Sequence, residues 1–403
     1  MDRVILHCDC NSFFASVEAA LNPALKNVPM AVCGSVEARH GIVLAKNELA
    51  KKYDIKTAET VFSAKRKCPT LVTVEPHHEI YAEYSRRVNE IYHRFTDMVE
   101  PFGIDESWLD VTASRKFFGT GAEIAEKIRC AVKEEIGITV SIGVSFNKIF
   151  AKLGSDYKKP DAITIIDKDN FKEIAYPLPV GSMIFVGKKT EEALRYLGVR
   201  TIGELAAMSP GILVSRFGKM GEALHKYANG LDDSPVSSER DEAKSIGNGF
   251  TFKHDLVSLE ECRVGIEFLS EEIGRKLRRA GVKCATVSIA IKDGYMRVVQ
   301  KQCAQNPPSD ISREIANTAY KLLLEVYSVG TPVRMITVTA NNFVRNEFVT
   351  EQLNMFDDGG AKEREKSKKR EETIDKIRQK HGLTSVINGA VLDGDLGIFK
   401  GKD

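Results

Sequence analysis

The sequence predicts an α+β protein of several domains, with a ferredoxin-like sheet near the N-terminus. Three observations support this fold class. Strand-like and helix-like segments follow one another over residues 4–153 in the order of a split βαβ unit. A polar stretch at 231–243 then separates them from a second region with its own helices and strands. The length of 403 residues and the hydrophobic content of 43% suffice for two to four domains.

Composition excludes several classes of protein. No run of 18 apolar residues occurs, and the N-terminus enters a strand-like pattern directly, so we expect neither a membrane span nor a secretory leader. The eight cysteines lack the paired short spacing of a zinc site. We therefore expect reduced thiols and a cytoplasmic protein without membrane partners.

The first predicted strand, 4–10, ends beside Asp9 and leads into a helix at 13–20. A carboxylate at the C-terminal end of a strand faces the crevice in which open sheets bind ligands, so Asp9 is a candidate ligand. Residues 23–78 resemble an insertion into this first domain. They contain strand-like segments at 29–33 and 41–45 and a helix-like one at 46–53.

An acidic hairpin follows a charged helix at 79–95. Apolar residues flank Asp105 and Glu106 within 102–110, which predicts two short strands with the carboxylates at their turn. A helix at 121–136, a strand at 139–146 and a helix from 147 to 153 complete the unit. In a ferredoxin-like sheet the strand of Asp9 and the hairpin are neighbours.

The acidic pair alone is typical of a solvated turn, and Asp9 gives it a chemical interpretation. Carboxylates about 5 Å apart repel by roughly 3 kcal/mol per pair at an effective dielectric near 20, and a divalent cation removes that cost. All-oxygen ligands favour Mg²⁺, and two such ions support in-line displacement at phosphorus. No P-loop, Ser-His-Asp set or dinucleotide fingerprint offers a rival chemistry.

The C-terminal half leaves alternatives open. Short helices between 186 and 205, joined by a Gly-containing hairpin, suit either phosphate binding or a small helical bundle. Residues 244–344 predict a separate α+β unit, with helices at 259–279 and 311–327 and strands at 285–291 and 335–340. The basic residues between 275 and 283 indicate either a phosphate-facing surface or a solvated helix end.

Several motifs in one order resemble those of Y-family DNA polymerases, most closely the DNA polymerase IV (DinB-like) branch, which performs translesion synthesis. These are Asp9 followed by FFASVE at 13–18, IDESWLD at 104–110, SFNKIFAK at 145–152, KPD at 159–161, SIG at 245–247 and FTF at 250–252. The similarity extends from residue 1 to about 345.

This resemblance implies a right-hand polymerase with a ferredoxin-like palm, small fingers, a helical thumb and an α+β little finger. The implied domains are the catalytic palm at 1–22 and 79–166, the fingers at 23–78, the thumb with helix-hairpin-helix elements at 167–234, a linker at 235–240, the little finger at 241–347 and a tail at 348–403.

The resemblance also implies roles for individual residues. Asp9, Asp105 and Glu106 become the catalytic carboxylates that bind two Mg²⁺ ions, with the backbone carbonyl of Cys10. Phe14 becomes the steric gate that excludes a 2′-hydroxyl. Lys159 and Lys51 become contacts of the incoming triphosphate. The clamp-binding peptide at 352–356 is implied by Gln352, Leu353, Met355 and Phe356.

The chain departs from the family pattern in four places. Glu48 and Lys51 stand where most relatives have Tyr and Arg, and Glu48 repels phosphate, so only Lys51, helped by nearby Lys46, takes over a phosphate role. Asn11 replaces a usual Asp. Phe185 stands where a Gly is common, which makes duplex contact by the thumb hairpin less certain.

The implied function is a DNA-directed DNA polymerase that adds deoxynucleotides to a primer 3′-hydroxyl with low fidelity and without proofreading. We expect primer-template DNA, deoxynucleoside triphosphates and a sliding clamp as partners of a monomer. Two alternatives remain: a catalytically weak, clamp-tethered DNA-binding accessory protein and a palm-type nucleotide cyclase. The role of the charged segment 362–380 is not predicted.

Overall fold

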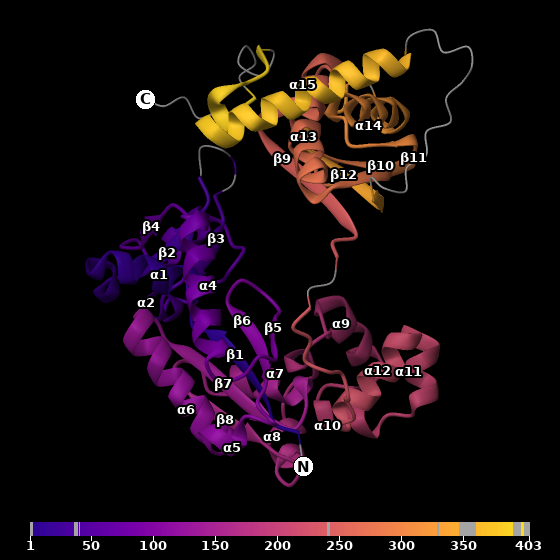
Figure 1. Cartoon of the computed structure of the whole chain (residues 1–403). Helices are drawn as coiled ribbons and strands as arrows, with labels where there is room; N and C mark the ends of the chain where they lie inside the picture. The colour runs from indigo at the N-terminus through magenta and orange to yellow at the C-terminus, as the bar shows by residue number, and fades with distance from the viewer. Residues whose placement is uncertain are drawn as a thin grey trace. The chain divides into compact units, whose positions relative to one another are not determined.

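The computed structural model describes residues 3–35, 39, 41–239, 242–328, 330–345, 360–389 and 396–398 (Figure 1). The chain divides into two compact units, and each has its own hydrophobic core. The first comprises Met1–Gly34 and Ile42–Arg240, and the second comprises Ser35–Gly41 and Asp241–Asp403.

A five-stranded sheet forms the centre of the first unit, in the order β5-β6-β1-β7-β8. Its strands are β1 (Ile5–Cys10), β5 (Val99–Pro101), β6 (Glu106–Asp110), β7 (Val140–Ser145) and β8 (Ile163–Ile166). β1 pairs antiparallel with both β6 and β7. Every residue of β1 and β7 is buried, so these strands are covered on both faces. The sequence prediction that β1 and the acidic hairpin are neighbours is confirmed.

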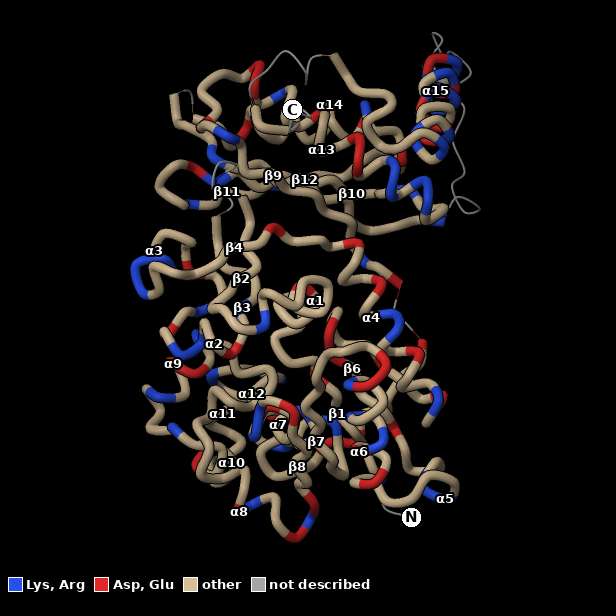
Figure 2. Tube along the Cα trace, turned by 90° about the vertical axis from the view of Figure 1, so that its left-hand side faces the viewer, with Lys and Arg blue, Asp and Glu red and all other residues tan. Residues whose placement is uncertain are grey.

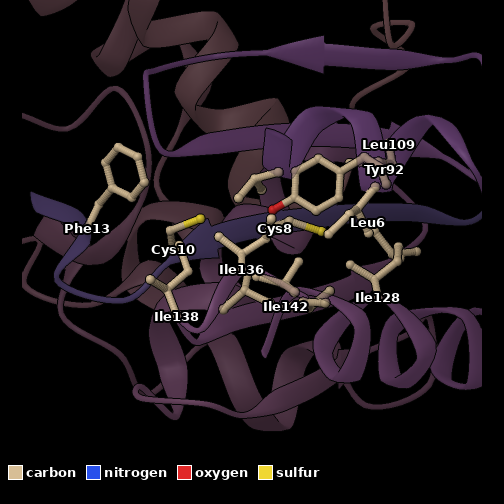
Figure 3. Close-up of a cluster of buried hydrophobic side chains, with 14 of the residues drawn as sticks. Leu6, Cys8, Cys10, Phe13, Tyr92, Leu109, Ile128, Ile136, Ile138 and Ile142 are labelled. Carbon is tan, nitrogen blue, oxygen red and sulfur yellow. The ribbon is translucent and has the colours of Figure 1, made fainter. Parts of the chain in front are cut away.

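Helices cover the two faces of this sheet. Those of the catalytic region are α1 (Phe13–Leu21), α4 (His78–His93), α5 (Arg115–Phe118), α6 (Gly121–Ala131) and α7 (Lys148–Tyr157). α6 continues into a π-helical turn at Val132–Ile136. On one face Leu6, Cys8 and Cys10 of β1 pack with Tyr92 of α4 and Ile128 of α6 (Figure 3). The opposite face, which carries His7 and Asp9, packs against α7.

Glycine permits α7 to approach the sheet closely. A Cβ atom at Gly143 of β7 would lie 1.9 Å from the carbonyl oxygen of Ala151 in α7, far inside contact distance. The helix begins at Asn147, whose side chain accepts a hydrogen bond of 2.8 Å from the Phe150 backbone. This close packing carries the side chains of Lys152 and Ser155 toward β1.

A small three-stranded sheet occupies the insertion between α1 and α4, in the order β3-β2-β4. Its elements are a 3-10 helix (Pro23–Asn27), β2 (Met30–Cys33), β3 (Val43–Lys46), α2 (Glu48–Lys51), α3 (Val61–Lys67) and β4 (Val72–Val74). It has its own buried cluster, which includes Val43, Ile55 and Leu71.

A group of short helices follows β8, and its core joins Leu194, Leu205 and Leu224 with Phe150 of α7 and Ile166 of β8. The helices are α8 (Phe171–Ala175), a 3-10 turn (Val180–Ser182), α9 (Lys188–Tyr196), α10 (Ile202–Ala207), α11 (Pro210–Phe217) and α12 (Lys219–Ala228). The end of this group returns to the catalytic sheet, because the Asn147 amide donates a hydrogen bond of 3.0 Å to the Gly230 carbonyl.

The segment after α12 is attached to the catalytic sheet, although its polar composition had suggested only a linker. Val236 is 1% exposed and packs with Ile5, Trp108 and Ala151. Beside it, the Ser237 backbone donates a hydrogen bond of 2.7 Å to Glu100. The chain is therefore fixed to the first unit at least as far as Ser237.

The second unit contains a four-stranded antiparallel sheet in the order β11-β10-β12-β9. Its elements are β9 (Ser245–Leu256), α13 (Leu259–Ala280), β10 (Val282–Asp293), β11 (Val298–Ser309), α14 (Ser312–Val326) and β12 (Val333–Arg345). The predicted helices are confirmed, and the two predicted strands correspond to parts of β10 and β12. β9 and β11 were missed, because Gly and Pro interrupt their sequences.

An additional helix, α15 (Gly360–His381), forms from the charged segment of unpredicted role, and it carries acidic and basic residues along its length (Figure 2). It docks on α13 through Arg278, whose guanidinium lies 2.5 Å from Glu371 and 2.7 Å from Asp375. Neither interpretation of the basic segment fits Arg278, since its side chain is only 10% exposed and serves this ion-pair cluster. None of the described helices is long and apolar enough to cross a membrane.

Candidate active site

The strand register places the predicted carboxylates at one end of the central sheet. Asp9 is directly opposite Glu106 in the β1 and β6 pairing, and the Cys10 backbone donates a hydrogen bond of 2.9 Å to the Asp105 carbonyl. All four residues line a cleft of about 540 Å³. Ligand atoms of Asp9, Glu106 and His7 lie within 4.8 Å of one another. Asp105 lines the same cleft but is not part of that tight group.

Two ammonium groups of the α7 region neutralise this acidic cluster. Lys152 lies 2.6 Å from Glu106 and 3.0 Å from Asp9. Lys159 lies 2.8 Å from the other oxygen of Asp9. Asp156 joins the two lysines, at 3.3 Å from Lys152 and 2.7 Å from Lys159. Cations thus already occupy positions between the carboxylates, as the repulsion between those groups requires.

The two adjacent carboxylates of the hairpin have opposite pKa shifts. Burial raises the pKa of Asp105 to about 6, and the nearby charges of Asp9 and Glu106 act in the same direction. Burial also opposes ionisation of Glu106, but the nearby His7 and the hydrogen bond from Lys152 outweigh it and lower that pKa to about 2. Burial lowers the pKa of Lys152, but Asp9, Asp156 and Glu106 outweigh it and raise that pKa above its ordinary value. Glu106 is therefore a carboxylate and Lys152 an ammonium at neutral pH.

His7 lies beneath Glu106 and is completely buried. Its Nδ1 atom is 2.8 Å from the Ser155 hydroxyl, and its Nε2 atom is 3.4 Å from Glu106 Oε2. The ring meets Trp108 edge to face, with centroids 5.2 Å apart. Burial lowers the pKa of His7, so the imidazole is neutral at physiological pH.

Asn11 fixes the loop between β1 and α1. It is 4% exposed, donates a hydrogen bond of 2.8 Å to Ser141, and accepts bonds from the Thr139 hydroxyl and the Asp161 backbone. An Asp at this position would lack the amide donor to Ser141. The departure from the family pattern at Asn11 thus has a structural role in this chain.

Phe14 enters the cleft from the first turn of α1 and is partly buried. Its ring stacks on Tyr81 with centroids 4.2 Å apart and an interplanar angle of 15°. The Tyr81 hydroxyl in turn donates a hydrogen bond to the buried Glu18. Phe14 is therefore held in place from behind while it still lines the cleft.

The fingers side of the cleft carries Lys46 and Lys51. Glu48, which the sequence analysis had expected to repel phosphate, pairs with Lys51 at 2.5 Å and accepts a hydrogen bond of 3.2 Å from Ser12. Lys46 donates to the Thr57 hydroxyl at 3.0 Å. The cleft thus has three lysines, 46, 51 and 159, in addition to Lys152.

The remaining predicted functional residues are those of the clamp-binding peptide and Phe185. Gln352, Leu353, Met355 and Phe356 lie outside the described residues. Phe185 has a φ of 71° and is half exposed in the hairpin before α9. Such a φ is uncommon for a bulky side chain, whereas Gly adopts it readily.

Sequence reasoning missed His7, Lys152 and Asp156 as members of the site. A signal existed for His7, because residues two apart on a strand face the same side and His7 precedes Asp9 by two. Lys152, Asp156 and Lys159 are spaced by four and three residues, which places them on one face of α7 and its continuation. Neither pattern identifies the cluster without the position of α7 against the sheet.

The donor set suits a hard divalent cation. Asp9, Asp105, Glu106 and Asp156 offer carboxylate oxygens, and Lys152 already places positive charge between two of them. Oxygen-rich sites of this kind prefer Mg²⁺ and leave coordination positions for water and phosphate. The residues present therefore fit the metal-dependent catalysis that the sequence pattern implies.

Comparison with known protein families covers most of the chain. Residues 8–156 match the impB/mucB/samB family, and residues 243–355 match the C-terminal domain of the same family. Residues 185–232 match the thumb domain described for DNA polymerase-iota. The three matches follow one another in the order that the sequence motifs had suggested.

Full-length relatives lead to the same family. DNA polymerase IV of Acetivibrio thermocellus is 45% identical over 97% of this chain and 98% of its own length. DNA polymerase IV 1 of Bacillus subtilis is 36% identical over 99% of this chain and 95% of its own length. A Y-family DNA polymerase chimera of Dbh and Dpo4 shares the fold, with a TM-score of 0.76 at 24% identity over 85% of this chain and 100% of its own. The chain therefore belongs to the Y family of DNA polymerases, within the DNA polymerase IV branch.

Proposed function

We propose that this protein extends a primer 3′-hydroxyl by template-directed addition of deoxynucleotides, copies past damaged bases with low fidelity, and does not proofread. Membership of the DNA polymerase IV branch supports the polymerase and translesion assignments. The observation that carries the proposal in this chain is the pairing of Asp9 with Glu106 across β1 and β6, in a cleft that lysines border. The nucleotide cyclase loses support, because relatives named DNA polymerase IV match over 97% of the chain.

The carboxylates have distinct proposed roles. Asp9 and Asp105, with the Cys10 carbonyl, hold the metal side of the site, and Glu106 is the carboxylate nearest the primer terminus. Two Mg²⁺ ions, when bound there, supply charge stabilisation for both the attacking and the leaving oxygen. Lys152, which now pairs with Asp9 and Glu106, would be repelled by a cation bound to them, since like charges repel.

The lysines of the cleft are proposed to receive the triphosphate. Lys159 lines the cleft from the segment after α7, and Lys51 lines it from the insertion at 23–78. Lys46 of the same insertion adds a third positive charge. An ammonium binds phosphate as a point charge and lacks the bidentate geometry of Arg. Binding of the triphosphate must therefore compete with the existing ion pairs to Asp9 and Glu48.

Phe14 is proposed to select the sugar. Its ring cannot retreat, because Tyr81 supports it from behind in a stacked contact. A 2′-hydroxyl placed against that ring would have to shift the whole aromatic pair. Stacking thus provides the rigidity that a steric gate needs.

The domains are proposed to have the boundaries that the sequence implied, a palm at 1–22 and 79–166, fingers at 23–78, a thumb at 167–234 and a little finger at 241–347, except that the linker placed at 235–240 begins only after Ser237. Primer-template DNA is the expected macromolecular substrate. Its polyanionic backbone would be bound by the basic residues of the thumb hairpin and the little finger.

Eight free thiols are consistent with a proposed cytoplasmic location.

The tail at 348–403 is proposed to hold the sliding-clamp peptide, with Leu353, Met355 and Phe356 as its apolar anchors and Gln352 as its polar one. Such short apolar motifs in polar surroundings bind pockets on partner proteins. We propose that the polymerase is a monomer and gains processivity only through the clamp.

Primer extension on matched undamaged and lesion-bearing templates tests the proposal. We expect Mg²⁺-dependent extension of both by the wild type, and at least a hundredfold lower rate for Glu106→Ala. Glu90→Ala, at an exposed pair with Arg86 on α4, is the control and should retain wild-type activity. Equal, near-zero incorporation by the wild type and Glu106→Ala would show that the enzymatic proposal is wrong.

A further inference from the structure

His7 is a buried polar side chain that neither the metal ligands nor the lysines of the site account for. It is 0% exposed, and its Nε2 atom has no hydrogen-bond partner among the described residues other than the Glu106 oxygen at 3.4 Å. A buried nitrogen without a partner costs about 1–3 kcal/mol. Retaining a polar ring here is therefore expensive unless it serves Glu106.

The other side of the ring is fixed by α7. The Ser155 hydroxyl lies 2.8 Å from His7 Nδ1 and equally close to the Lys152 carbonyl. The hydroxyl has a single proton to donate. If it donates to the Lys152 carbonyl, its oxygen accepts from an Nδ1–H, and a neutral ring then directs the Nε2 lone pair at the Glu106 carboxylate, which is electrostatically unfavourable. The charge of Glu106 therefore favours donation to Nδ1, which places the ring proton on Nε2 and presents an N–H to the carboxylate.

Packing holds the imidazole in the plane that this contact requires. Trp108 meets the ring edge to face at 5.2 Å, and Trp108 is itself fixed by Lys148, whose ammonium lies 4.4 Å from the indole centroid. The Trp108 indole N–H also donates to the Lys148 carbonyl at 3.1 Å. His7 has little freedom to rotate away from Glu106.

We propose that His7 is a positioning residue, which donates a hydrogen bond from Nε2 to Glu106 and holds that carboxylate in its metal-binding orientation. The inference rests on the proposed function of Glu106. Lys152 also contacts Glu106, but it is a cation and is repelled when a metal binds. The His7 ring is held by Ser155 and Trp108 and keeps its contact with Glu106 in both states, so it supplies the constant part of the support.

Two substitutions separate positioning from packing. His7→Phe retains an aromatic ring against Trp108 and removes the donor, whereas His7→Gln restores an N–H donor in a different shape. His93→Phe, at an exposed histidine of α4, is the matched control. Each variant is compared by kcat and KM for the incoming nucleotide, by Mn²⁺ affinity measured with EPR in the absence of DNA, and by thermal unfolding with a chelator present.

We expect His7→Phe to lower kcat at least tenfold, change KM less than twofold and weaken Mn²⁺ binding severalfold, while its unfolding temperature is unchanged or higher. His7→Gln should recover part of kcat and of Mn²⁺ affinity. Wild-type kcat and Mn²⁺ affinity in His7→Phe would overturn the inference. So would a lower unfolding temperature in both variants without recovery by Gln, because that pattern indicates packing alone.

Nitrogen NMR of histidine-labelled protein gives an independent readout. The His7 Nε2 signal should report a protonated nitrogen in the wild type and shift on Glu106→Gln, with no such shift for His93. An unprotonated Nε2 would contradict the inference directly. If the wild type proves inactive on primed templates, the proposed function fails, but the Mn²⁺ affinity and the NMR signal still decide the role of His7.

Discussion

Two neighbouring carboxylates, Asp105 and Glu106, have opposite pKa shifts because, among the described residues, only Glu106 receives a side-chain hydrogen bond. Glu106 receives contacts from His7 and Lys152, whereas burial dominates at Asp105. Their backbone positions are adjacent in the hairpin, so the difference arises from what α7 and β1 present to each side chain. The site therefore stores unfavourable electrostatic energy at Asp105, which a bound cation relieves.

Substitution of Asp105 should stabilise the metal-free fold. The folded pKa of about 6 exceeds the unfolded value of about 3.9, so the native state holds this proton more tightly and loses stability as pH rises from about 4 to about 6. After allowance for solvent screening, the charge costs about 2 kcal/mol at pH 7. We expect Asp105→Asn to raise the unfolding temperature by several degrees at pH 7.5 with a chelator.

The same comparison at pH 4 should give little difference, because the wild-type carboxyl is then protonated as well. Asp97→Asn, at an exposed position before β5, controls for the loss of one negative charge. Equal stabilisation by Asp105→Asn at both pH values would contradict the electrostatic explanation.

We expect Glu48 to compete with the incoming triphosphate for Lys51, since the two side chains form an ion pair. The 2.5 Å ion pair is about half exposed, so its free energy is below about 1 kcal/mol, which corresponds to a factor of at most five in an equilibrium constant. Glu48→Gln should therefore lower KM for the nucleotide twofold to fivefold and leave kcat nearly unchanged. Steady-state kinetics over a range of salt concentrations measures this effect, which should shrink as salt increases.

Lys51→Met removes the lysine itself and should have the opposite effect, a rise in KM for the nucleotide of at least threefold. Glu90→Gln removes an exposed carboxylate that pairs with Arg86 on α4, and this control should leave KM unchanged. An unaltered KM in Glu48→Gln would mean that Lys51 does not contact the triphosphate.

At the scale of elements, α15 is held on α13 by ion pairs of Arg278, whose side chain is almost completely buried. Arg278 contacts Glu371, Asp375 and the Asp310 carbonyl, and Glu371 also accepts hydrogen bonds from the backbone and hydroxyl of Ser312. Each partner is satisfied by the others, which is the condition under which buried charge is tolerated. Removing one partner leaves the remainder uncompensated.

We expect Arg278→Met to weaken the docking of α15 by about 3 kcal/mol, because Glu371 loses its buried partner. Limited trypsin digestion should then cleave within 362–380 much faster than in the wild type, while primer extension without a clamp is unaffected. Lys369→Gln, which removes an exposed pair with Glu365 on the same helix, should leave the digestion rate unchanged. Unaltered protection in Arg278→Met would show that other contacts hold the helix.

Sequence patterns predicted most elements of the first unit but few of the interactions between them. The order of elements, which suits a ferredoxin-like sheet, was enough to predict that the strand of Asp9 and the acidic hairpin are neighbours. Lys152 was read only as part of a motif, because its role depends on how closely α7 approaches Gly143. Arg278 and Glu371 are 93 residues apart, so no local pattern could indicate their pairing. The sequence predicted no role for the charged segment 362–380, which the structure shows as part of a docked helix.

At the scale of the whole molecule, synthesis and recruitment are expected to depend on separate parts of the chain. The carboxylates belong to the first unit, whereas the proposed clamp peptide at 352–356 follows β12 of the second. Replacing Leu353, Met355 and Phe356 together by Ala should leave distributive synthesis unchanged and abolish stimulation by the clamp. Primer extension with and without a loaded clamp measures both quantities.

Polar residues of the same segment offer the matched control for that experiment. Replacing Asp357 and Asp358 by Asn should retain most of the stimulation, since apolar anchors supply the binding energy of such peptides. Loss of basal synthesis in the triple variant would instead mean that the segment is structural.

The return of the chain from α12 to the catalytic sheet has a practical consequence. The helical group 171–228 leaves the sheet after β8 and comes back at Gly230, whose carbonyl accepts a hydrogen bond from the Asn147 side chain. Its core also includes Phe150 of α7 and Ile166 of β8, so the group is packed onto the sheet layer as well as joined to it at both ends. Related polymerases could exchange this group at two fixed junctions, provided that the α7 and β8 residues of its core are exchanged with it.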